Sequence, residues 1–259
     1  MTTFTEETLT ERHVWLPGKL FSVRTTRPPR LLFTAGQFAR LGLSTPGSGK
    51  DGAAGTVWRA YSMVGAPDDD FLEFFSIVVP GGEFSEPLAQ LQLGAKLRVD
   101  SAPYGLLTLE RLAPGPHLWL LGSGTGLAPF LSMLQDPSTW RRFETVVLAH
   151  SVRAPEELAY REHMPLWLKK LGIAPNRFVY VPVITRRHTP GTLQQRLPAL
   201  IANGALESWA GLPLQPDQAR AVVCGNPDMV GELRALLKTR GFTTSRREKP
   251  GQLLVENYW

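Results

Sequence analysis

The stretch His117-Leu-Trp-Leu-Leu-Gly-Ser-Gly-Thr-Gly-Leu-Ala-Pro-Phe130 decides the fold of the C-terminal half. An apolar strand, Leu118 to Leu121, leads through a glycine-rich turn into a helix that begins near Pro129, where proline suits the first helical turn. Glycine lets a ligand approach the backbone closely, and the amides at a helix start favour an anion. This order favours a nucleotide site, although an ordinary strand-to-helix turn explains the stretch alone equally well.

Composition limits the possible classes of protein. The 259 residues suffice for two domains, and 43% of them are hydrophobic. No apolar run reaches the roughly 18 residues of a membrane span, and the start lacks the plan of a signal peptide. The single cysteine, Cys224, excludes an internal disulfide and fits a reducing compartment. We therefore expect a cytoplasmic protein that does not bind a membrane.

The charge is mildly basic. The formal net charge is +5, and no dense run of Lys and Arg marks a groove for nucleic acid. A basic surface that attracts an acidic protein or a phosphorylated cofactor explains this charge as well. We expect no nucleic-acid partner.

The pattern of strands and helices predicts two domains, residues 1–112 and 113–259. The first part carries many short segments of strand character separated by Pro or Gly, as in a barrel or sandwich, with one helix expected over 88–93. The second part alternates strands with helices, which predicts a parallel sheet with ligands beyond the carboxyl ends of its strands. Its expected strands are 118–121, 145–150, 177–183 and 221–224, and its expected helices are 129–134, 155–171, 193–202 and 227–240.

Two segments of the first part could hold an anionic, flat ligand. In Arg59-Ala-Tyr-Ser62, the arginine could bind a phosphate, the phenol ring could stack on a heterocycle, and the serine could hydrogen-bond its edge. A surface arginine beside a core tyrosine is the plainer alternative. In Pro80-Gly-Gly-Glu-Phe-Ser85, backbone amides and Ser85 could bind a second phosphate, although most such sequences are simple turns.

The turn at 122–126 departs from the Rossmann dehydrogenase pattern. Its third glycine position is Leu127, and the second strand ends in His150-Ser-Val-Arg153 rather than in a carboxylate. An arginine there favours the 2′-phosphate of NADP(H), and Arg186 and Arg196 could join it. Any one of these arginines is more often a solvated surface charge.

Two further segments close the candidate site. Cys224-Gly-Asn-Pro-Asp228 ends the fourth strand, where a ligand contact is plausible and a nucleophilic role is not, because no histidine neighbours the cysteine in sequence. The chain stops on Tyr258 and Trp259, with Glu256 close by. These rings either pack against the core or cover a flat cofactor.

Taken together, R-x-Y-S, G-x-G-T-G-x-x-P, C-G-N-P and the aromatic C-terminus resemble the ferredoxin–NADP⁺ reductase family, most closely its bacterial ferredoxin/flavodoxin reductases. The resemblance covers nearly the whole chain. It implies an FAD-binding antiparallel β-barrel over 1–112. It also implies an NADP(H)-binding α/β domain over 113–259, with a five-stranded parallel sheet and a C-terminal tail that returns to the flavin.

The resemblance also implies individual roles. Ser62 is expected near the flavin N5, Cys224 near the nicotinamide, and Glu256 and Tyr258 beside the flavin, and these four are the candidate catalytic residues. No metal site is expected. The residues expected to bind FAD or NADP(H) are Arg59, Ala60, Tyr61, Ser62, Phe75, Ile77, Gly82, Phe84, Ser85, Gly124, Thr125, Arg153, Arg186, Arg196, Cys224, Asp228, Tyr258 and Trp259.

The activity implied is reversible electron transfer, in which NADPH passes hydride to FAD and single electrons then pass to ferredoxin or flavodoxin. A monomer is expected. One alternative is an NADPH-dependent flavin reductase component that feeds an oxygenase or a haem protein. Another is a non-catalytic flavin- or nucleotide-binding regulator.

The aromatic C-terminus generates a first prediction. Deleting Trp259 should raise the dissociation constant of FAD, because the deletion removes a ring expected to stack on the adenine. FAD release from the purified truncated protein, followed by ultrafiltration and flavin absorbance, measures this. Retention equal to that of the full chain would count against stacking.

Overall fold

The computed structural model describes residues 4–45, 55–246 and 248–257. The chain divides into two compact units, residues 1–106 and 107–259, and each is described by itself. We expected the boundary a few residues later, after residue 112. Tyr258 and Trp259 lie outside the described residues, so their expected roles stay predictions.

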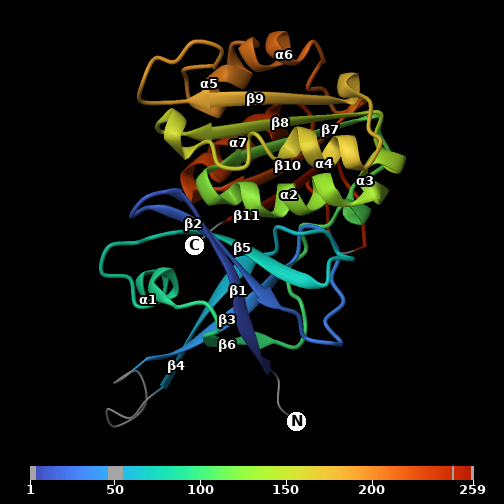
Figure 1. Cartoon of the computed structure of the whole chain (residues 1–259). Coiled ribbons are helices and arrows are strands. Elements are labelled where there is room, and N and C mark those ends of the chain that lie inside the picture. Colours follow the sequence, from blue (N-terminus) through green and yellow to red (C-terminus); the bar gives the residue numbers. More distant parts are fainter. Residues whose placement is uncertain (1–3, 46–54, 247, 258–259) are drawn as a thin grey trace. The chain divides into compact units, whose positions relative to one another are not determined.

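The first unit is built on one antiparallel sheet of six strands (Figure 1). Its spatial order is β4-β3-β6-β1-β2-β5. The two outer strands of this order meet, because Met63 pairs with Phe74 and the Val64 N–H donates to the Glu73 carbonyl at 2.9 Å. The sheet thus closes on itself, which confirms the expected antiparallel barrel. The strands are β1 (Phe4–Leu16), β2 (Leu20–Thr26), β3 (Phe38–Thr45), β4 (Gly55–Ser62), β5 (Phe71–Ile77) and β6 (Lys96–Asp100).

Apolar side chains from all parts of this unit fill the barrel. Leu9, Val23, Leu41 and Phe74 are fully buried and belong to one core cluster. The helix α1 (Ser85–Gln90) adds Leu88 to that cluster. It begins three residues earlier than expected, and Pro87 lies in its first turn, where no intrahelical N–H bond is lost.

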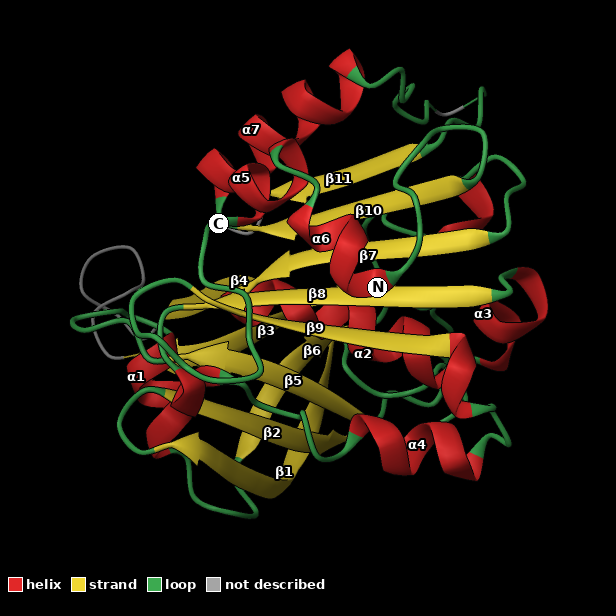
Figure 2. Ribbon diagram, turned by 90° about the horizontal axis from the view of Figure 1, so that it is seen from above, coloured by secondary structure: helices red, strands yellow, loops and turns green. Residues whose placement is uncertain are grey.

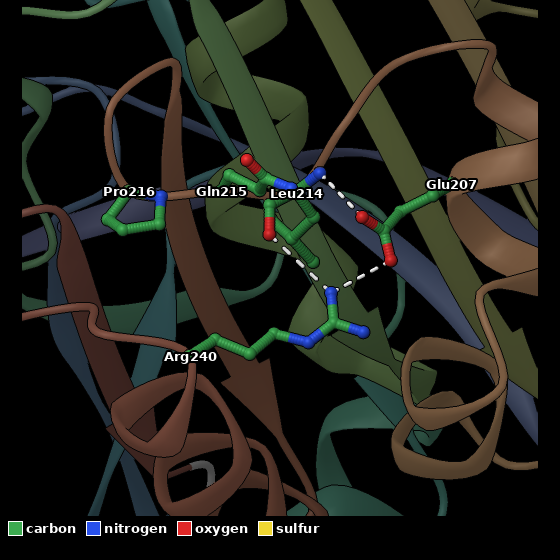
Figure 3. Close-up of a pocket in the computed structure, with 5 residues that line it drawn as sticks. All are labelled: Glu207, Leu214, Gln215, Pro216 and Arg240. Atoms are coloured by element: carbon green, nitrogen blue, oxygen red, sulfur yellow. Dashed lines mark hydrogen bonds and ion pairs between the residues drawn. The ribbon is translucent and has the colours of Figure 1, made fainter.

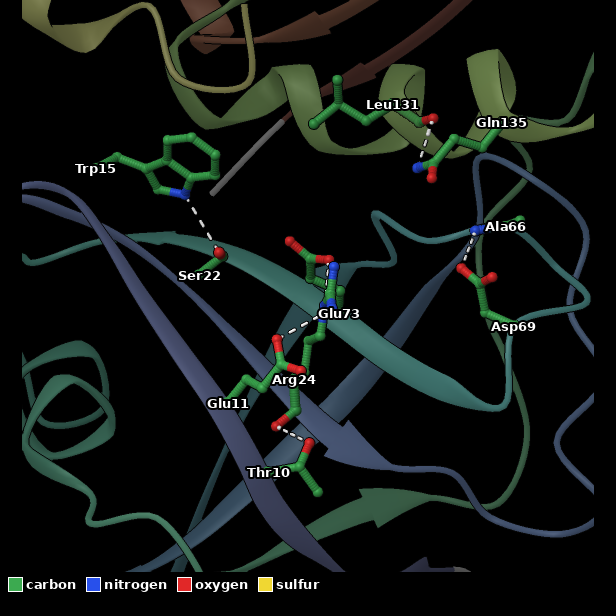
Figure 4. Close-up of polar contacts among 10 residues, drawn as sticks. All are labelled: Thr10, Glu11, Trp15, Ser22, Arg24, Ala66, Asp69, Glu73, Leu131 and Gln135. Atoms are coloured by element: carbon green, nitrogen blue, oxygen red, sulfur yellow. Dashed lines mark hydrogen bonds and ion pairs between the residues drawn. The ribbon is translucent and has the colours of Figure 1, made fainter. Parts of the chain in front are cut away.

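A polar cluster also joins three strands of the barrel wall (Figure 4). The Arg24 guanidinium on β2 lies 3.0 Å from Glu11 on β1 and 2.9 Å from Glu73 on β5. The same guanidinium stacks over the Phe71 ring, 4.4 Å from its centroid. Because Glu73 is nearly buried, its charge needs this partner. The cluster therefore fixes which residues of the three strands face one another.

The second unit contains a five-stranded parallel sheet, as expected. Its order is β11-β10-β7-β8-β9, so β7 lies at the centre, and the C-terminal segment supplies the edge strand β11. Apolar runs such as Leu118–Leu121 are buried on both faces, which is typical of a parallel sheet covered by helices. The strands are β7 (His117–Ser123), β8 (Thr145–Val152), β9 (Phe178–Ile184), β10 (Ala219–Gly225) and β11 (Leu253–Asn257).

Helices cover both faces of this sheet (Figure 2). Alternation along β7 sends Trp119 and Leu121 into the core formed with α5, α6 and α7, and Leu118 and Leu120 to the opposite face. On that face lie α2 (Ala128–Gln135), α3 (Pro137–Arg142) and α4 (Met164–Lys170). The first face carries α5 (Leu197–Ala202), α6 (Ala205–Ala210) and α7 (Pro227–Thr239).

Two of the expected helices differ from the structure. The predicted helix over 155–171 is wrong, because the segment forms a 3₁₀ turn, η4 (Pro155–Glu157), then a bend, and only then α4. Buried Tyr160 has a left-handed φ of 61°, which no helix interior accepts. The helix expected over 193–202 begins at Leu197, because Leu193 instead bridges to Val183 beside the sheet.

Candidate functional site

The candidate ligand-binding residues of the first unit centre on the end of β4. Arg59 and Ala60 are both exposed, and Ser62 is buried. The Arg59 guanidinium lies 3.7 Å from the exposed carboxylate of Glu83. Two consecutive exposed residues do not follow the alternation of a strand with one covered face. Both faces of this part of β4 are therefore accessible to solvent, and the Arg59 guanidinium supplies a positive charge there.

Tyr61 is held in place by neighbours on β5 and at the start of α1. Its hydroxyl lies 3.1 Å from the Ser76 hydroxyl, and its ring packs against Phe84 at 5.6 Å and Phe74 at 6.4 Å between centroids. Burial raises the pKa of Tyr61, although Ser76 and Arg59 act in the opposite direction. The phenol is therefore neutral, and its ring is oriented before any ligand arrives.

The turn after β5 is tight, and side chains at the start of α1 accept hydrogen bonds from two of its backbone N–H groups. The Ser85 hydroxyl accepts a hydrogen bond from the Val79 N–H at 2.9 Å, and the Glu86 carboxylate accepts one from the Gly81 N–H at 2.9 Å. A Cβ on Gly82 would lie 2.8 Å from the Val79 carbonyl oxygen, so the turn requires glycine there. Glu86 thus occupies one of the amides expected to bind phosphate, while the Ser85 O–H can still donate.

The remaining predicted residues of this unit lie on the same elements. Phe75 is buried and Ile77 half-buried on β5, and Phe84 is buried directly before α1. Of these, Phe84 contacts Tyr61, whereas alternation along β5 sends Phe75 and Ile77 to the face opposite Phe74 and Ser76.

In the second unit, the glycine-rich turn follows the central strand β7. Gly122 has His150 of β8 opposite it on one side and Cys224 of β10 on the other. Gly124 begins a 3₁₀ turn, η3 (Gly124–Leu127), with a left-handed φ of 54° and no atom within 4 Å of its would-be Cβ. Thr125 is buried in this turn. The turn leads directly into α2, so its amides lie at a helix start as expected.

This turn packs directly against the turn that follows β10. A Cβ on Gly126 would lie 2.6 Å from the Cα of Gly225. The Asn226 N–H donates to the Ser123 hydroxyl at 3.0 Å, and the Asn226 side chain caps α7 at the Met229 N–H. Sequence reasoning did not single out Asn226, although an asparagine followed by proline at a strand end is typical of a helix cap. Asp228 lies in the first turn of α7.

A buried histidine supports the turn from the other side. The His150 side chain is fully buried, with its Nε2 3.1 Å from the Gly124 carbonyl oxygen and its Nδ1 3.4 Å from the Tyr180 hydroxyl. Burial lowers the pKa of His150 to about 4, although the Gly124 carbonyl and the charge of Glu157 act in the opposite direction. The imidazole is therefore neutral at physiological pH. Its role was not predicted.

Cys224 and Glu256 face each other across β10 and β11 in the parallel register. Cys224 is fully buried, and burial together with the charge of Glu256 raises the pKa of its thiol well above the usual range. Burial also raises the pKa of Glu256 to about 7. The cysteine is thus a neutral thiol rather than a nucleophile, and the glutamate can exchange a proton near neutrality.

The three predicted arginines lie at strand and helix ends, and all are exposed. Two come together, because the Arg186 N–H donates to the Arg153 carbonyl at 3.2 Å. The Arg153 guanidinium lies 3.5 Å from Glu157, which also accepts the Arg153 N–H at 3.0 Å. Arg196 precedes α5 and instead pairs with Glu232 of α7 at 2.9 Å.

Arg187 was not predicted as a site residue, yet it lies beside Arg186 and pairs with Glu156 of η4. Two consecutive glutamates of one short turn therefore each hold an arginine from a strand end. The run Thr-Arg-Arg-His at 185–188 was the available signal for Arg187.

A surface depression of about 340 Å³ lies elsewhere in the second unit (Figure 3). It is lined by Glu207, Leu214, Gln215, Pro216 and Arg240. Arg240 donates to Glu207 at 2.8 Å, and Glu207 accepts the Leu214 N–H at 2.9 Å. Glu207 and Arg240 are thus already hydrogen-bonded within the chain. None of the residues predicted to bind a cofactor lines this depression.

The described ranges hold neither a cluster of metal-ligating side chains nor a helix that could span a membrane. Over 4–45, 55–246 and 248–257, the structure contains no group of three His, Cys, Asp or Glu side chains arranged to hold a metal ion. Within those same ranges, no helix combines the length and the apolar character needed to cross a membrane.

Comparison with known proteins gives one family model over part of the chain, and relatives and a solved structure over nearly all of it. The family model of the oxidoreductase NAD-binding domain matches residues 120–234. The chain is 40% identical to ferredoxin–NADP reductase A of Sorangium cellulosum, over 98% of this chain and 89% of the relative. It is 37% identical to the flavodoxin/ferredoxin–NADP reductase of Escherichia coli, over 95% and 99%. A crystal structure of a ferredoxin NADP⁺ reductase from Neisseria gonorrhoeae with bound FAD and NADP superposes with a TM-score of 0.90 at 36% identity, covering both chains completely.

Acid should destabilise the protein through His150. In the unfolded chain a histidine binds a proton near pH 6.5, whereas His150 in the folded chain does so only near pH 4. The unfolded state therefore binds more protons between these values, and stability falls as the pH falls. Between pH 7 and pH 5, the native protein should lose about 2 kcal/mol more free energy of unfolding than the variant His150→Gln.

Urea titrations at both pH values measure this difference. His188 is exposed, so His188→Gln serves as the matched control and should keep the full loss. Equal losses in the native protein and in His150→Gln would contradict a buried neutral imidazole.

Proposed function

Because the chain belongs to the ferredoxin–NADP reductase family, we propose that it is an oxidoreductase in which bound FAD takes hydride from NADPH and gives single electrons to ferredoxin or flavodoxin. The observation that carries the proposal is the turn at Gly124–Leu127. It leads from the central strand into a helix, beside the end of β10, in a chain whose relatives are named as these reductases.

We assign FAD to residues 1–112 and NADP(H) to residues 113–259. The donors at the end of β4 fit the flavin nucleotide, since Arg59 offers an exposed guanidinium to a phosphate and Tyr61 offers a fixed ring. Buried Ser62 would lie near the flavin N5. The predicted residues on β5, the following turn and α1 would complete the FAD site, with Trp259 and Tyr258 covering its rings.

Arg153, Arg186 and Arg196 would hold the 2′-phosphate of NADP(H). Arg153 and Arg196 now have carboxylate partners, Glu157 and Glu232. The Arg196–Glu232 pair is exposed on both sides and contributes little to stability, so a phosphate can replace Glu232 at small cost. Glu157 is buried, and it would keep the hydrogen bond from the Arg153 N–H when the guanidinium turns to a phosphate. Gly124, Thr125 and Asp228 would contact the rest of the dinucleotide from the two turns.

The candidate catalytic residues have distinct roles in this proposal. Cys224, as a neutral thiol, would border the nicotinamide without reacting. Glu256 would hold or release a proton at its carboxyl group, because its pKa of about 7 lies near physiological pH. Tyr258 would exclude water from the flavin face and move when nicotinamide enters.

We also propose that the protein works as a cytoplasmic monomer. Support comes from the sequence, which has a single cysteine and a net charge of +5. A basic surface would attract acidic electron carriers, and salt would screen that attraction.

An absorption spectrum of the purified protein tests the proposed function. Flavin bands should be present or appear after incubation with FAD, bleach with NADPH, and return when ferredoxin or flavodoxin is added. A preparation that stays colourless with FAD would reject the proposal. Flavin bands that NADPH leaves unchanged would favour a nucleotide-binding regulator.

The arginine cluster generates a separate prediction about cofactor choice. Arg153→Ala should raise the KM for NADPH about tenfold or more and leave the KM for NADH within about twofold, because only NADPH carries the 2′-phosphate. Arg161→Ala is the matched control, since Arg161 is another exposed arginine with a glutamate neighbour, 3.9 Å away. Steady-state dye reduction measures both constants. Equal changes for the two cofactors would reject the assigned role of Arg153.

A further inference from the structure

Three residues from three neighbouring strand regions form one line of hydrogen bonds in the second unit. Tyr180 lies on β9, His150 on β8, and Gly124 directly follows β7. The Tyr180 hydroxyl lies 3.4 Å from His150 Nδ1, and His150 Nε2 lies 3.1 Å from the Gly124 carbonyl oxygen. The line therefore runs from an outer strand of the sheet to the first residue of the glycine-rich turn.

The chemistry of the two ends fixes the direction of every bond. A carbonyl oxygen can only accept, so His150 Nε2 must carry the proton that bonds to Gly124. In a neutral imidazole Nδ1 then has no proton and accepts from Tyr180. Burial raises the pKa of the Tyr180 phenol, which keeps that donor protonated. One tautomer of His150 is thus specified by its surroundings.

The position of the bond matters because Gly124 is the point where the chain leaves the strand. The residue has a left-handed φ of 54°, which turns the following amides away from the strand direction. On the β10 side, the turn is held by the Ser123–Asn226 hydrogen bond and by the packing of Gly126 against Gly225. On the β8 side, the His150 side chain hydrogen-bonds to the turn at the Gly124 carbonyl.

We propose that His150 and Tyr180 are positioning residues that hold the Gly124–Leu127 turn in the shape that receives the pyrophosphate of NADP(H). The inference rests on the proposed function, since it takes NADP(H) as the ligand of this turn. The two side chains act through the turn, because His150 is fully buried and bonds to its backbone. Their effect falls on the pyrophosphate and not on the 2′-phosphate, which the exposed arginines would hold.

Two amide substitutions distinguish loss of the hydrogen bond to Gly124 from loss of a polar side chain at this position. In His150→Gln the amide nitrogen reaches about as far as Nε2 and can donate to the Gly124 carbonyl. In His150→Asn it reaches only about as far as Nδ1 and cannot. The pair is therefore matched in chemistry and differs in reach. Tyr180→Phe removes the longer and weaker of the two bonds.

Binding to the FAD-loaded protein is measured by titration with two probes. NADP⁺ carries both the pyrophosphate and the 2′-phosphate, whereas 2′-AMP carries the 2′-phosphate alone. We expect the Kd of NADP⁺ to rise about fivefold in His150→Asn, about twofold in Tyr180→Phe, and less than twofold in His150→Gln. The Kd of 2′-AMP should stay the same in all three variants.

The outcomes separate this inference from its premise. Unchanged NADP⁺ binding in His150→Asn overturns the inference, and so does an equal loss for NADP⁺ and 2′-AMP, which would indicate general damage. Equal losses in the Asn and Gln variants also overturn it. Failure of the native protein itself to bind NADP⁺ would instead reject the proposed function.

A measurement on the native protein covers the case in which His150→Asn does not fold. Nitrogen-15 NMR of the histidine-labelled protein should show one of the five histidines as the Nε2–H tautomer, and this resonance should not titrate between pH 8 and about pH 5. The resonance missing from His150→Gln assigns it. The Nδ1–H tautomer, or a signal averaged between the two, would overturn the inference.

Discussion

The close approach of two backbones at Gly126 and Gly225 is the constraint on which the second unit depends. A single added carbon on Gly126 would lie 2.6 Å from the Cα of Gly225, a separation that no side chain can share. Because the two turns touch, the carboxyl ends of β7 and β10 lie side by side at one edge of the sheet. The Ser123–Asn226 hydrogen bond joins the same two turns, Asn226 caps α7, and the strand register places Cys224 opposite Gly122. A nucleotide site at the sheet edge needs backbone that a ligand can approach, and Gly124, which has no atom within 4 Å of its would-be Cβ, offers it beside this contact.

Local features of the sequence were enough to predict much of this fold. The apolar run Leu118–Leu121, the glycines after it and Pro129 at the helix start each indicate structure within a few residues, and the central strand, turn and helix were predicted from them. The helix expected over 155–171 failed because its pattern is interrupted by tertiary structure. Tyr160 is buried in a left-handed conformation that only its surroundings impose, and helix periodicity contains no sign of it.

The candidate site shows the same division between local and distant interactions. Arg153 was predicted from its place at a strand end, and Glu157, its partner, lies only four residues away. The bond between His150 and Gly124 joins residues 26 positions apart, so no spacing rule could indicate it. The position of a histidine one strand away, opposite a glycine in register, becomes visible only when the parallel sheet is assembled. The roles of Tyr258 and Trp259 remain predictions.

Electrostatics distinguishes the two kinds of group around the glycine-rich turn. The arginines at the strand ends are exposed and paired with Glu157, Glu156 and Glu232, so their charges are already partly balanced before an anion arrives. In the proposed function a phosphate would replace Glu156 or Glu232, which are exposed and screened by water, at little cost to the fold. Glu157 is buried and would keep the hydrogen bond from the Arg153 N–H. His150 is the reverse case. It is uncharged and fully enclosed, so it cannot be exchanged for a ligand group, and its hydrogen bond contributes to the shape of the backbone itself. In the proposed function, selection of the 2′-phosphate and placement of the pyrophosphate would thus rest on separate residues, which can be changed independently.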